Sequence, residues 1–526
     1  MKYSLLALLS GLFLALGWPT YGFPILLFFG FVPLLLSEHQ LRTAKGKSSW
    51  KILGLSYITF VIWNFITTNW LWYADPFGAS FAILVNSLLM AILFVIYHKL
   101  AAKTTLNKAL IGLVSLWLCF EKLHLGWEFS WPWLNLGNGF SEYYKWIQWY
   151  EFTGTFGGSL WVWIVNIVLF KGILGYQQTK DKRFISSSLI KSVVLVILPI
   201  SISLIMYYNY EEQKETVEVI ALQPNIDPYS EKYSVSNMEF ADLLVDLSEH
   251  EIETSTRLLL TPETYFAKNV RLSQFEASRF KYQLDQLLYT YKNLNIVSGI
   301  SFYKLIHDKD SLTPESNYYK DNLWYNDYNS AILLNGNKTE IYHKSKLVVG
   351  VENFPYQEIL MPIIGDAMID LGGTVAMKST QDYRSVFDLK ATEAKLAPII
   401  CYESVYGEFV TEYVRNGANL LGIITNDAWW DTTQGHKQHL SYARLRAIEN
   451  RRSVVRSANT GISALINERG DITSSLPYGE QGVLKGKVAL NETLTVYTKI
   501  GDVISRIALF LALFILLISF FRKPKV

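Results

Sequence analysis

Long runs of apolar residues, separated by short polar breaks, fill the first 210 residues of the chain and return near its end. A helix of about 20 residues crosses the ~30 Å hydrocarbon core of a bilayer. Eight runs are predicted to span a membrane as helices: residues 3–18, 22–37, 52–72, 79–97, 104–120, 153–170, 192–208 and 503–521. The first run also has features of a secretory signal peptide, but the runs directly after it make cleavage unnecessary.

Residues 211–500 have a different composition, the mixture of charged and apolar residues typical of a soluble α/β domain. The chain is 50% hydrophobic and 18% charged, and these averages conceal the two parts. We therefore expect a seven-helix membrane domain over residues 1–210, a soluble domain over residues 211–500, and an eighth helix with a basic tail over residues 501–526. The net charge of +2 and the lack of a basic stripe with interleaved aromatic residues argue against nucleic acid as a partner.

The loops between the apolar runs differ in their content of lysine and arginine. Every second loop is basic, and basic loops are retained on the cytoplasmic side of a membrane. These residues are Arg42, Lys45, Lys47, Lys51, Lys99, Lys103, Lys108, Lys171, Lys180, Lys182, Arg183 and Lys191. The alternation predicts both termini in the cytoplasm and residues 211–500 on the outer side, which in a bacterium with two membranes is the periplasmic side of the inner membrane.

Aromatic and polar residues within the membrane part have more than one interpretation. Residues 127–137 contain three tryptophans, a density typical of an interfacial belt, with a lipid-handling surface as the alternative. Four asparagines within the apolar runs are expected to bond between helices rather than to bind substrate: Asn64, Asn69, Asn86 and Asn166.

Short β-rich segments alternate with helical ones between residues 211 and 500. Strands are predicted at residues 216–223, 257–261, 294–302, 329–335, 396–401 and 420–425. Helices are predicted at residues 235–250, 274–291, 404–416 and 435–451. A hairpin around Gly470 is expected to end the domain. This alternation indicates a layered α/β or α+β domain with its site at strand ends.

Three polar residues stand where apolar strands end: Glu263, Lys344 and Cys401. Each alone is more typical of a solvated loop residue or, for the cysteine, of a small buried hydrophobe. Together they supply what acyl transfer to a thiol requires. A carboxylate can accept the thiol proton, and an ammonium can stabilise the oxyanion of the tetrahedral intermediate.

Metal and cofactor chemistry has little support in the sequence. The chain has two cysteines, Cys119 in an apolar run and Cys401, so a structural disulfide is not expected. No paired His/Cys spacing indicates a metal, and His436 and His439 on a predicted helix are expected to be packing or solvated residues. No glycine-rich phosphate loop is present, so no cofactor is predicted.

Several short sequence words resemble one family. They are Thr-Pro-Glu-Thr at residues 261–264, Tyr-His-Lys at 342–344, Cys-Tyr-Glu at 401–403, Asn-Asp-Ala-Trp at 426–429, Ala-Arg-Leu-Arg-Ala at 443–447 and Pro-Trp-Leu-Asn-Leu-Gly at 132–137. In this order, with apolar runs on both sides, they resemble the bacterial apolipoprotein N-acyltransferases, the membrane-embedded branch of the nitrilase superfamily. The resemblance covers almost the whole chain and implies an extracytoplasmic nitrilase-like α-β-β-α sandwich beside eight transmembrane helices.

The resemblance implies roles for individual residues. Glu263 is the general base, Lys344 stabilises the oxyanion and Cys401 is the nucleophile. Glu352, eight residues beyond the lysine, resembles the family's second essential glutamate. Tyr402 and Glu403 are supporting groups, with direct substrate contact and packing beneath the site as equal alternatives.

Two segments depart from the family's pattern. The family's Leu-Val-Pro-Phe-Gly-Glu is replaced by Leu-Val-Val-Gly-Val-Glu at residues 347–352. The family's Gln-x-Asn-Ile is present at residues 223–226, but Tyr233 stands near the place of a functional tryptophan on a mobile arm.

The implied reaction moves an acyl chain from a phospholipid, through a thioester on Cys401, to the α-amino group of a diacylated lipoprotein. It needs no cofactor or metal, and we expect a monomer whose partners are these two lipid substrates. The alternatives are a membrane-tethered nitrilase-type amidase and a non-catalytic scaffold that binds lipids or lipoproteins. The amidase leaves eight spans without a role, and the intact Glu–Lys–Cys set argues against the scaffold.

Overall fold

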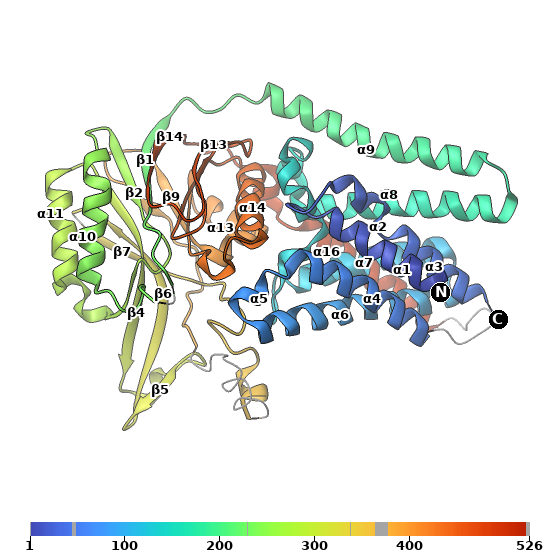
Figure 1. Ribbon diagram of the computed structural model, residues 1–526, viewed down its shortest axis with the longest axis horizontal. Coiled ribbons are helices and arrows are strands. Elements are labelled where there is room, and N and C mark those ends of the chain that lie inside the picture. The colour runs from blue at the N-terminus through green and yellow to red at the C-terminus, as the bar shows by residue number, and fades with distance from the viewer. Residues whose placement is uncertain (1, 45–48, 229, 337, 363–376, 522–526) are drawn as a thin grey trace. The chain divides into compact units, whose positions relative to one another are not determined.

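The computed structural model describes residues 2–44, 49–228, 230–336, 338–362 and 377–521 of the chain. It consists of two compact units (Figure 1). The helical unit comprises Met1–Tyr210 and Ile500–Val526, and the α/β unit comprises Glu211–Lys499.

The helical unit has a helix at each of the eight predicted places. Its main helices are α1 (Lys2–Leu16), α2 (Leu27–Gly30), α3 (Val32–Thr43), α4 (Ser49–Thr68), α5 (Leu71–Ala74), α6 (Pro76–Lys103), α7 (Leu106–Leu123), α8 (Tyr150–Thr179), α9 (Arg183–Asn209) and α16 (Val503–Phe520). Short 3₁₀ segments cover Pro24–Leu26, Pro132–Leu134 and Leu136–Trp146.

Six segments of the described chain are long and apolar enough to cross a membrane. They are Pro24–Thr43, which joins α2 and α3, together with α4, α6, α8, α9 and α16. Helix α1 has 15 residues, fewer than a full span needs. Helix α7 has 18 residues but carries Lys108, Glu121 and Lys122. Length and composition therefore support six of the eight predicted spans.

The outer surface of the helical unit is apolar. Helix α9 runs beside α8 (Figure 1) and exposes residues such as Ile190, Ile197 and Leu198, while it buries Ser192 and Ser203. Lipid is the solvent that accepts such a surface, because hydrocarbon tails are as apolar as the side chains.

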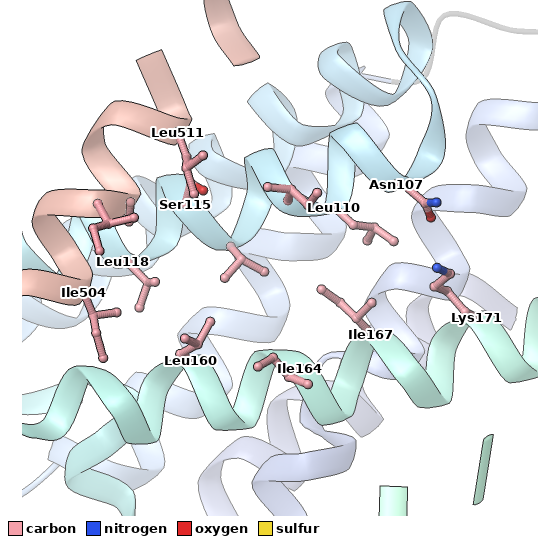
Figure 2. Close-up of a pocket in the computed structure, with 14 residues that line it drawn as sticks. Asn107, Leu110, Ser115, Leu118, Leu160, Ile164, Ile167, Lys171, Ile504 and Leu511 are labelled. Atoms are coloured by element: carbon pink, nitrogen blue, oxygen red, sulfur yellow. The ribbon is translucent and has the colours of Figure 1, made fainter. Parts of the chain in front are cut away.

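A groove of about 500 Å³ lies between α7, α8 and α16 (Figure 2). Its lining is almost wholly apolar, with Leu118 and Ile504 toward one end and Asn107 and Lys171 at the other. This groove belongs to the helical unit alone.

Asn64, Asn86 and Asn166 bond between helices, as predicted, whereas Asn69 accepts from the hydroxyl of Tyr21, which lies in a turn, at 3.1 Å. The Nδ2 atom of Asn86 in α6 donates to Oδ1 of Asn64 in α4 at 2.8 Å. Asn166 in α8 accepts from the backbone N–H of Phe31 at 2.8 Å and donates to the Leu27 carbonyl at 2.9 Å. These bonds satisfy polar groups that lipid could not.

The tryptophan-rich loop packs inside the helical unit instead of forming only a belt. Trp133 is buried and stacks with Trp131 at a centroid distance of 5.9 Å. Leu136 donates its N–H to the buried Glu121 carboxylate at 2.8 Å. A Cβ atom on Gly137 would lie 1.9 Å from the Thr155 carbonyl oxygen, so only glycine fits there.

The α/β unit contains two sheets. The first has the order β14-β1-β2-β4-β6-β5, with β3 also paired to β4 and β7 to β6, and the second has the order β13-β12-β11-β10-β9-β8. The first sheet consists of β1 (Thr216–Gln223), β2 (Thr256–Leu260), β3 (Phe266–Arg271), β4 (Asn295–Ile306), β5 (Asn317–Lys320), β6 (Leu323–Leu334), β7 (Thr339–His343) and β14 (Gly482–Ala489). The second consists of β8 (Phe387–Asp388), β9 (Lys395–Ile400), β10 (Leu420–Thr425), β11 (Val454–Ala458), β12 (Ser463–Ile466) and β13 (Ile472–Leu476).

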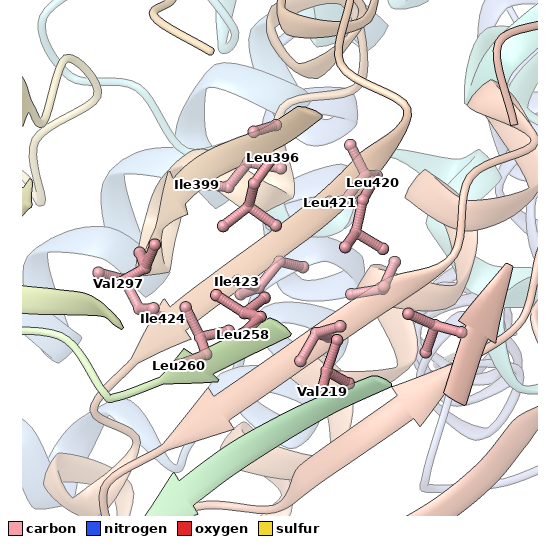
Figure 3. Packing of buried hydrophobic residues seen from close by; sticks show 14 of the residues in the cluster. Val219, Leu258, Leu260, Val297, Leu396, Ile399, Leu420, Leu421, Ile423 and Ile424 are labelled. Carbon is pink, nitrogen blue, oxygen red and sulfur yellow. The ribbon is translucent and has the colours of Figure 1, made fainter. Parts of the chain in front are cut away.

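Side chains alternate between two hydrophobic cores, as the period of two along a strand requires. Val219 of β1 packs in the core between the sheets, with Leu258 of β2 and Ile423 of β10 (Figure 3). Its neighbour Ile220 packs in the other core, against α10 (Asn237–Ser248) and α11 (Arg279–Thr290). Helices α13 (Gly407–Arg415) and α14 (Gln434–Asn450) lie beside the second sheet, so the layers are α-β-β-α (Figure 1).

The predicted strands and helices are confirmed in place, but the predicted end of the domain is wrong. The hairpin around Gly470 forms β12 and β13, and another strand, β14, follows it. Strand β14 pairs antiparallel with β1 at the edge of the first sheet, from Gly482 opposite Gln223 to Ala489 opposite Thr216. Charged residues such as its two lysines are typical of an edge strand. Together with its two glycines they interrupt the apolar alternation from which a strand is predicted.

Candidate active site

Cys401 stands at the end of β9, where the chain turns into a 3₁₀ segment over Cys401–Val405. Its φ of 49° is in the left-handed region, which costs a non-glycine residue about 1–2 kcal/mol. The side chain is 8% exposed. Such strain at a buried thiol is typical of a functional turn.

Glu263 lies in a turn after β2 that is equally constrained. The next residue, Thr264, has a φ of 45°. Gly299 of β4 packs directly against this turn, because a Cβ atom there would lie 2.3 Å from the Pro262 carbonyl oxygen and 2.4 Å from the Thr264 nitrogen. A glycine at this place lets the turn approach the sheet closely.

Lys344 follows β7 and joins two carboxylates. Its Nζ atom is 2.8 Å from Oε1 of Glu263 and 2.8 Å from Oε2 of Glu352, and the side chain is 1% exposed. Asn329 of β6 donates its Nδ2 to both carboxylates, at 2.8 Å to Glu263 and 2.9 Å to Glu352. The sequence did not single out Asn329, which has no signal beyond its place on a predicted strand.

The electrostatics assign a resting state to Cys401 and Glu263. Burial raises the pKa of the Cys401 thiol, and Glu263 raises it further against the opposing effect of Lys344. Burial also opposes ionisation of Glu263, but Lys344 and Lys232 hold the pKa of this carboxyl below its ordinary value. The pair therefore rests as thiol and carboxylate, a state in which the carboxylate can accept a proton.

Glu403 is fully buried and accepts hydrogen bonds on both carboxylate oxygens. Its Oε1 accepts from the Tyr342 hydroxyl at 2.6 Å and from the Ser345 N–H at 2.7 Å, and its Oε2 accepts from the Ile400 N–H at 2.8 Å. It thus joins the residue before Cys401 to the residue after Lys344. Tyr402 is also buried and packs edge-on against Tyr406.

The altered loop still delivers Glu352 to Lys344. Gly350 adopts a φ of 78° and donates its N–H to the Asn353 carbonyl at 3.0 Å. Glu352 accepts from the Val348 N–H at 2.9 Å, which fixes its carboxylate. Tyr233 is 57% exposed, and partial burial together with Glu263, Glu352 and Asp327 raises the pKa of its hydroxyl.

A second buried network lies behind Cys401. His439 of α14 has Nε2 3.3 Å from the Cys401 carbonyl oxygen and Nδ1 3.0 Å from Oδ1 of Asp427. Arg456 of β11 donates to Oδ2 of Asp427. Burial opposes ionisation of Asp427, yet Arg456 and His439 hold the pKa of its carboxyl well below its ordinary value. His439 is thus a buried partner of the Cys401 backbone, and the alternative of a solvated residue is wrong.

The Ala-Arg-Leu-Arg-Ala word also supports this region. Arg446 donates its NH1 to the Val405 carbonyl at 3.0 Å and forms a buried ion pair with Glu449 at 2.9 Å. It therefore fixes the end of the segment that begins at Cys401. Across the described ranges, no three His, Cys, Asp or Glu side chains are grouped so as to hold a metal ion.

Lys232 is a site residue that the sequence did not indicate. It belongs to the segment before Tyr233, and its side chain is 3% exposed. Its Nζ donates to Oγ1 of Thr264 at 2.5 Å and to the Glu263 carbonyl at 3.3 Å. It lies among polar residues in a segment without regular secondary structure, so no periodic pattern in the sequence indicates that it is buried.

Both units match families of known proteins. Residues 216–496 match the carbon-nitrogen hydrolase family, and residues 10–168 match the N-terminal domain of apolipoprotein N-acyltransferase. Apolipoprotein N-acyltransferases of Chlorobaculum tepidum and Geobacter metallireducens are 26% and 27% identical, over 98% and 99% of this chain and 96% and 95% of those proteins. Saccharomyces cerevisiae Nit3, a nitrilase superfamily member of known structure, is 16% identical over 53% of this chain and 92% of its own, with a TM-score of 0.38.

Proposed function

The chain belongs to the carbon-nitrogen hydrolase family, and we propose that it is an apolipoprotein N-acyltransferase that uses Cys401 to carry the acyl group. The observation that best supports this proposal is the cluster in which Lys344 forms ion pairs with Glu263 and Glu352. Lys344 also interacts electrostatically with Cys401. This cluster occurs in a chain that aligns with apolipoprotein N-acyltransferases over nearly its whole length.

The first half-reaction acylates Cys401. The Glu263 carboxylate takes the Sγ–H proton, and the sulfur attacks the carbonyl carbon of a phospholipid acyl ester. Lys344 stabilises the oxyanion of the tetrahedral intermediate. The carbon–oxygen bond then breaks, Glu263 returns the proton to the leaving lysophospholipid, and a thioester remains.

The second half-reaction releases the acyl group to the acceptor. The neutral α-amino group of a diacylated lipoprotein cysteine attacks the thioester carbon, and Glu263 takes a proton from the nitrogen. The carbon–sulfur bond breaks, an amide forms, and the proton returns to the thiolate. Burial and the nearby Glu263 favour the protonated thiol and therefore make the thiolate a poorer leaving group. Lys344 opposes this effect because it stabilises the negative charge on sulfur.

Both substrates are anchored lipids, which explains the helical unit. In this proposal all eight helices span a bacterial inner membrane, including the short α1 and the charged α7. The distribution of Lys and Arg over the loops supports an orientation with the α/β unit on the periplasmic side, where diacylated lipoproteins meet the outer leaflet. The active species is a monomer without cofactor or metal.

The membrane-tethered amidase is the competing activity, because the same triad can pass an acyl group to water. The match of residues 10–168 to the N-terminal domain of apolipoprotein N-acyltransferase favours transfer to a lipoprotein. Scaffold function alone would give no reason to keep Lys344 and two carboxylates buried together, since buried charges are costly.

Intact-mass spectrometry of the purified full chain in detergent tests the proposal. Incubation with phospholipid should add one acyl mass to Cys401, and a diacylated lipopeptide should then remove it and gain an amide-linked chain. Cys401→Ser is expected to reduce acylation below detection while the chain keeps its unfolding temperature. Cys119→Ser serves as the matched control and should acylate normally.

The outcomes separate the alternatives. An adduct that disappears in water as fast as with lipopeptide would identify an amidase or esterase. Unchanged lipopeptide acylation by the Cys401→Ser variant would exclude the thioester route.

A further inference from the structure

The charges around Cys401 do not balance if only the predicted residues are counted. Two carboxylates, the buried Glu263 and the largely buried Glu352, face one ammonium, Lys344. Removal of the Cys401 proton by Glu263 leaves the total at one excess negative charge, now with a thiolate at the reacting atom. An uncompensated negative charge in a buried site is strongly unfavourable.

Lys344 is also occupied as a donor. Its Nζ donates hydrogen bonds to Oε1 of Glu263 at 2.8 Å and to Oε1 of Glu352 at 3.0 Å, and lies 2.8 Å from Oε2 of Glu352. The positive charge of Lys344 is therefore shared between two carboxylates before any oxyanion or thiolate forms. A second cation near the site would balance the excess negative charge.

The ammonium of Lys232 lies where it can supply this second positive charge. Its Nζ lies against the Glu263 turn, at 3.3 Å from the Glu263 carbonyl oxygen and 2.5 Å from Thr264 Oγ1. Glu263, Cys401 and Lys344 are the charged or titratable groups that interact with it electrostatically. With Lys232 included, two carboxylates face two ammonium groups, and the cluster is neutral before and after proton transfer.

We propose that Lys232 is a positioning residue of the active site, which makes the charge of the Glu263–Glu352–Lys344 cluster neutral and stabilises negative charge on the Cys401 sulfur. This rests on the proposed function only in taking Cys401 as the nucleophile. The hydrogen bonds of Lys232 to Thr264 and to the Glu263 carbonyl place its charge, while the charge itself acts on the thiol.

The protonation of Lys232 gives the proposal a pH signature. Burial lowers the pKa of Lys232 to about 8, against the opposing effects of Glu263 and Cys401. Its positive charge is therefore present below about pH 8 and is lost as pH rises through that value. Thiolate formation at Cys401 should lose this support in the same range.

Alkylation of Cys401 by iodoacetamide measures thiolate formation without any lipid. The full chain carries Cys119→Ala, so that Cys401 is its only thiol, and the adduct is followed by intact mass from pH 6 to 10. A positive charge that interacts with a thiol lowers its pKa, and one pKa unit changes the thiolate fraction about tenfold. Lys232→Met should therefore alkylate about tenfold more slowly at pH 7, and the difference from the parent should shrink above about pH 8, where Lys232 loses its charge. Lys232→Arg should stay close to the parent protein.

Three further variants separate charge from structure. Lys232→Gln keeps a donor without the charge and should behave as Lys232→Met does, even if that variant folds poorly. Thr264→Val removes the hydroxyl partner but leaves the ammonium and its bond to the Glu263 carbonyl, and should shift the pH profile less than Lys232→Gln does. Lys292→Met removes an exposed lysine of the same unit and should change nothing.

The results decide between two separate claims. A parent-like profile for Lys232→Gln, or an equal shift for Thr264→Val, would overturn the role of the Lys232 charge. A wild-type protein that alkylates normally but never forms an acyl adduct would instead overturn the proposed function and leave the role of Lys232 standing.

Discussion

The helical unit and the α/β unit bury polar groups of different kinds. Between helices, the bonds of Asn64, Asn86 and Asn166 join neutral amides to each other or to backbone groups. At the strand ends of the α/β unit, Lys344 and Glu263 form a buried ion pair at 2.8 Å. The first kind joins helices through neutral groups, whereas the second holds opposite charges together in a buried place.

This difference predicts different costs of substitution. A neutral amide that loses its partner forfeits a modest hydrogen bond, and in membranes such bonds average only about 0.6 kcal/mol. A buried ion that loses its partner remains as an uncompensated charge, at a cost of about 3–5 kcal/mol. Variants in the two units should therefore rank in this order.

The largest effect is expected for Lys344→Met in the α/β unit. It leaves Glu263 and Glu352 facing each other without the ammonium between them. We expect acyl-enzyme formation to be lost and the free energy of unfolding to fall by about 3–5 kcal/mol. Chemical unfolding of the full chain in detergent and the intact-mass assay measure the two effects.

A matched triple variant tests the cause of that loss. Lys344→Met combined with Glu263→Gln and Glu352→Gln removes all three charges and should recover most of the stability but none of the activity. If the triple variant is no more stable than the single one, packing around Lys344 and not its charge determines the cost.

A smaller effect in the same unit is expected for Gly299→Ala. The added Cβ would meet the Pro262 carbonyl oxygen at 2.3 Å and must displace the turn that carries Glu263. Overpacking of this kind costs about 1–3 kcal/mol, and acyl-enzyme formation should slow as the base moves. Gly482→Ala is the control, because its Cβ would meet only Leu476 at 3.9 Å. Equal unfolding temperatures for the two variants would show that the turn does not depend on Gly299.

Much of the fold follows from local sequence pattern. The predicted strand over residues 216–223 is β1 to the residue. Strand β11 was missed because Arg456 interrupts its apolar run. This arginine is fully buried only because Asp427 neutralises it, and Asp427 is 29 residues away in the sequence. A tertiary ion pair of this kind leaves no periodic signal.

The site divides in the same way. Glu263, Lys344 and Cys401 follow recognisable strands, so their place at strand ends could be predicted. Lys232 lies in an irregular segment, and only the fold brings it to Thr264. Asn329 lies on a predicted strand, but its bridge between Glu263 and Glu352 depends on the register of β6 beside β7.

The smallest effect is expected in the helical unit, where Asn86→Leu removes the bond from α6 to Asn64. Asn64 keeps the bond from its Nδ2 to the Phe60 carbonyl at 2.9 Å, and only its Oδ1 acceptor loses a partner. A double-mutant cycle with Asn64→Leu should give a coupling of about 0.6 kcal/mol, close to the average for bonds between membrane helices. Unfolding of the full chain in increasing sodium dodecyl sulfate measures it, with acylation unchanged. A coupling as large as the cost of Lys344→Met would mean that the amides of the helical unit are as strongly constrained as the ions of the α/β unit.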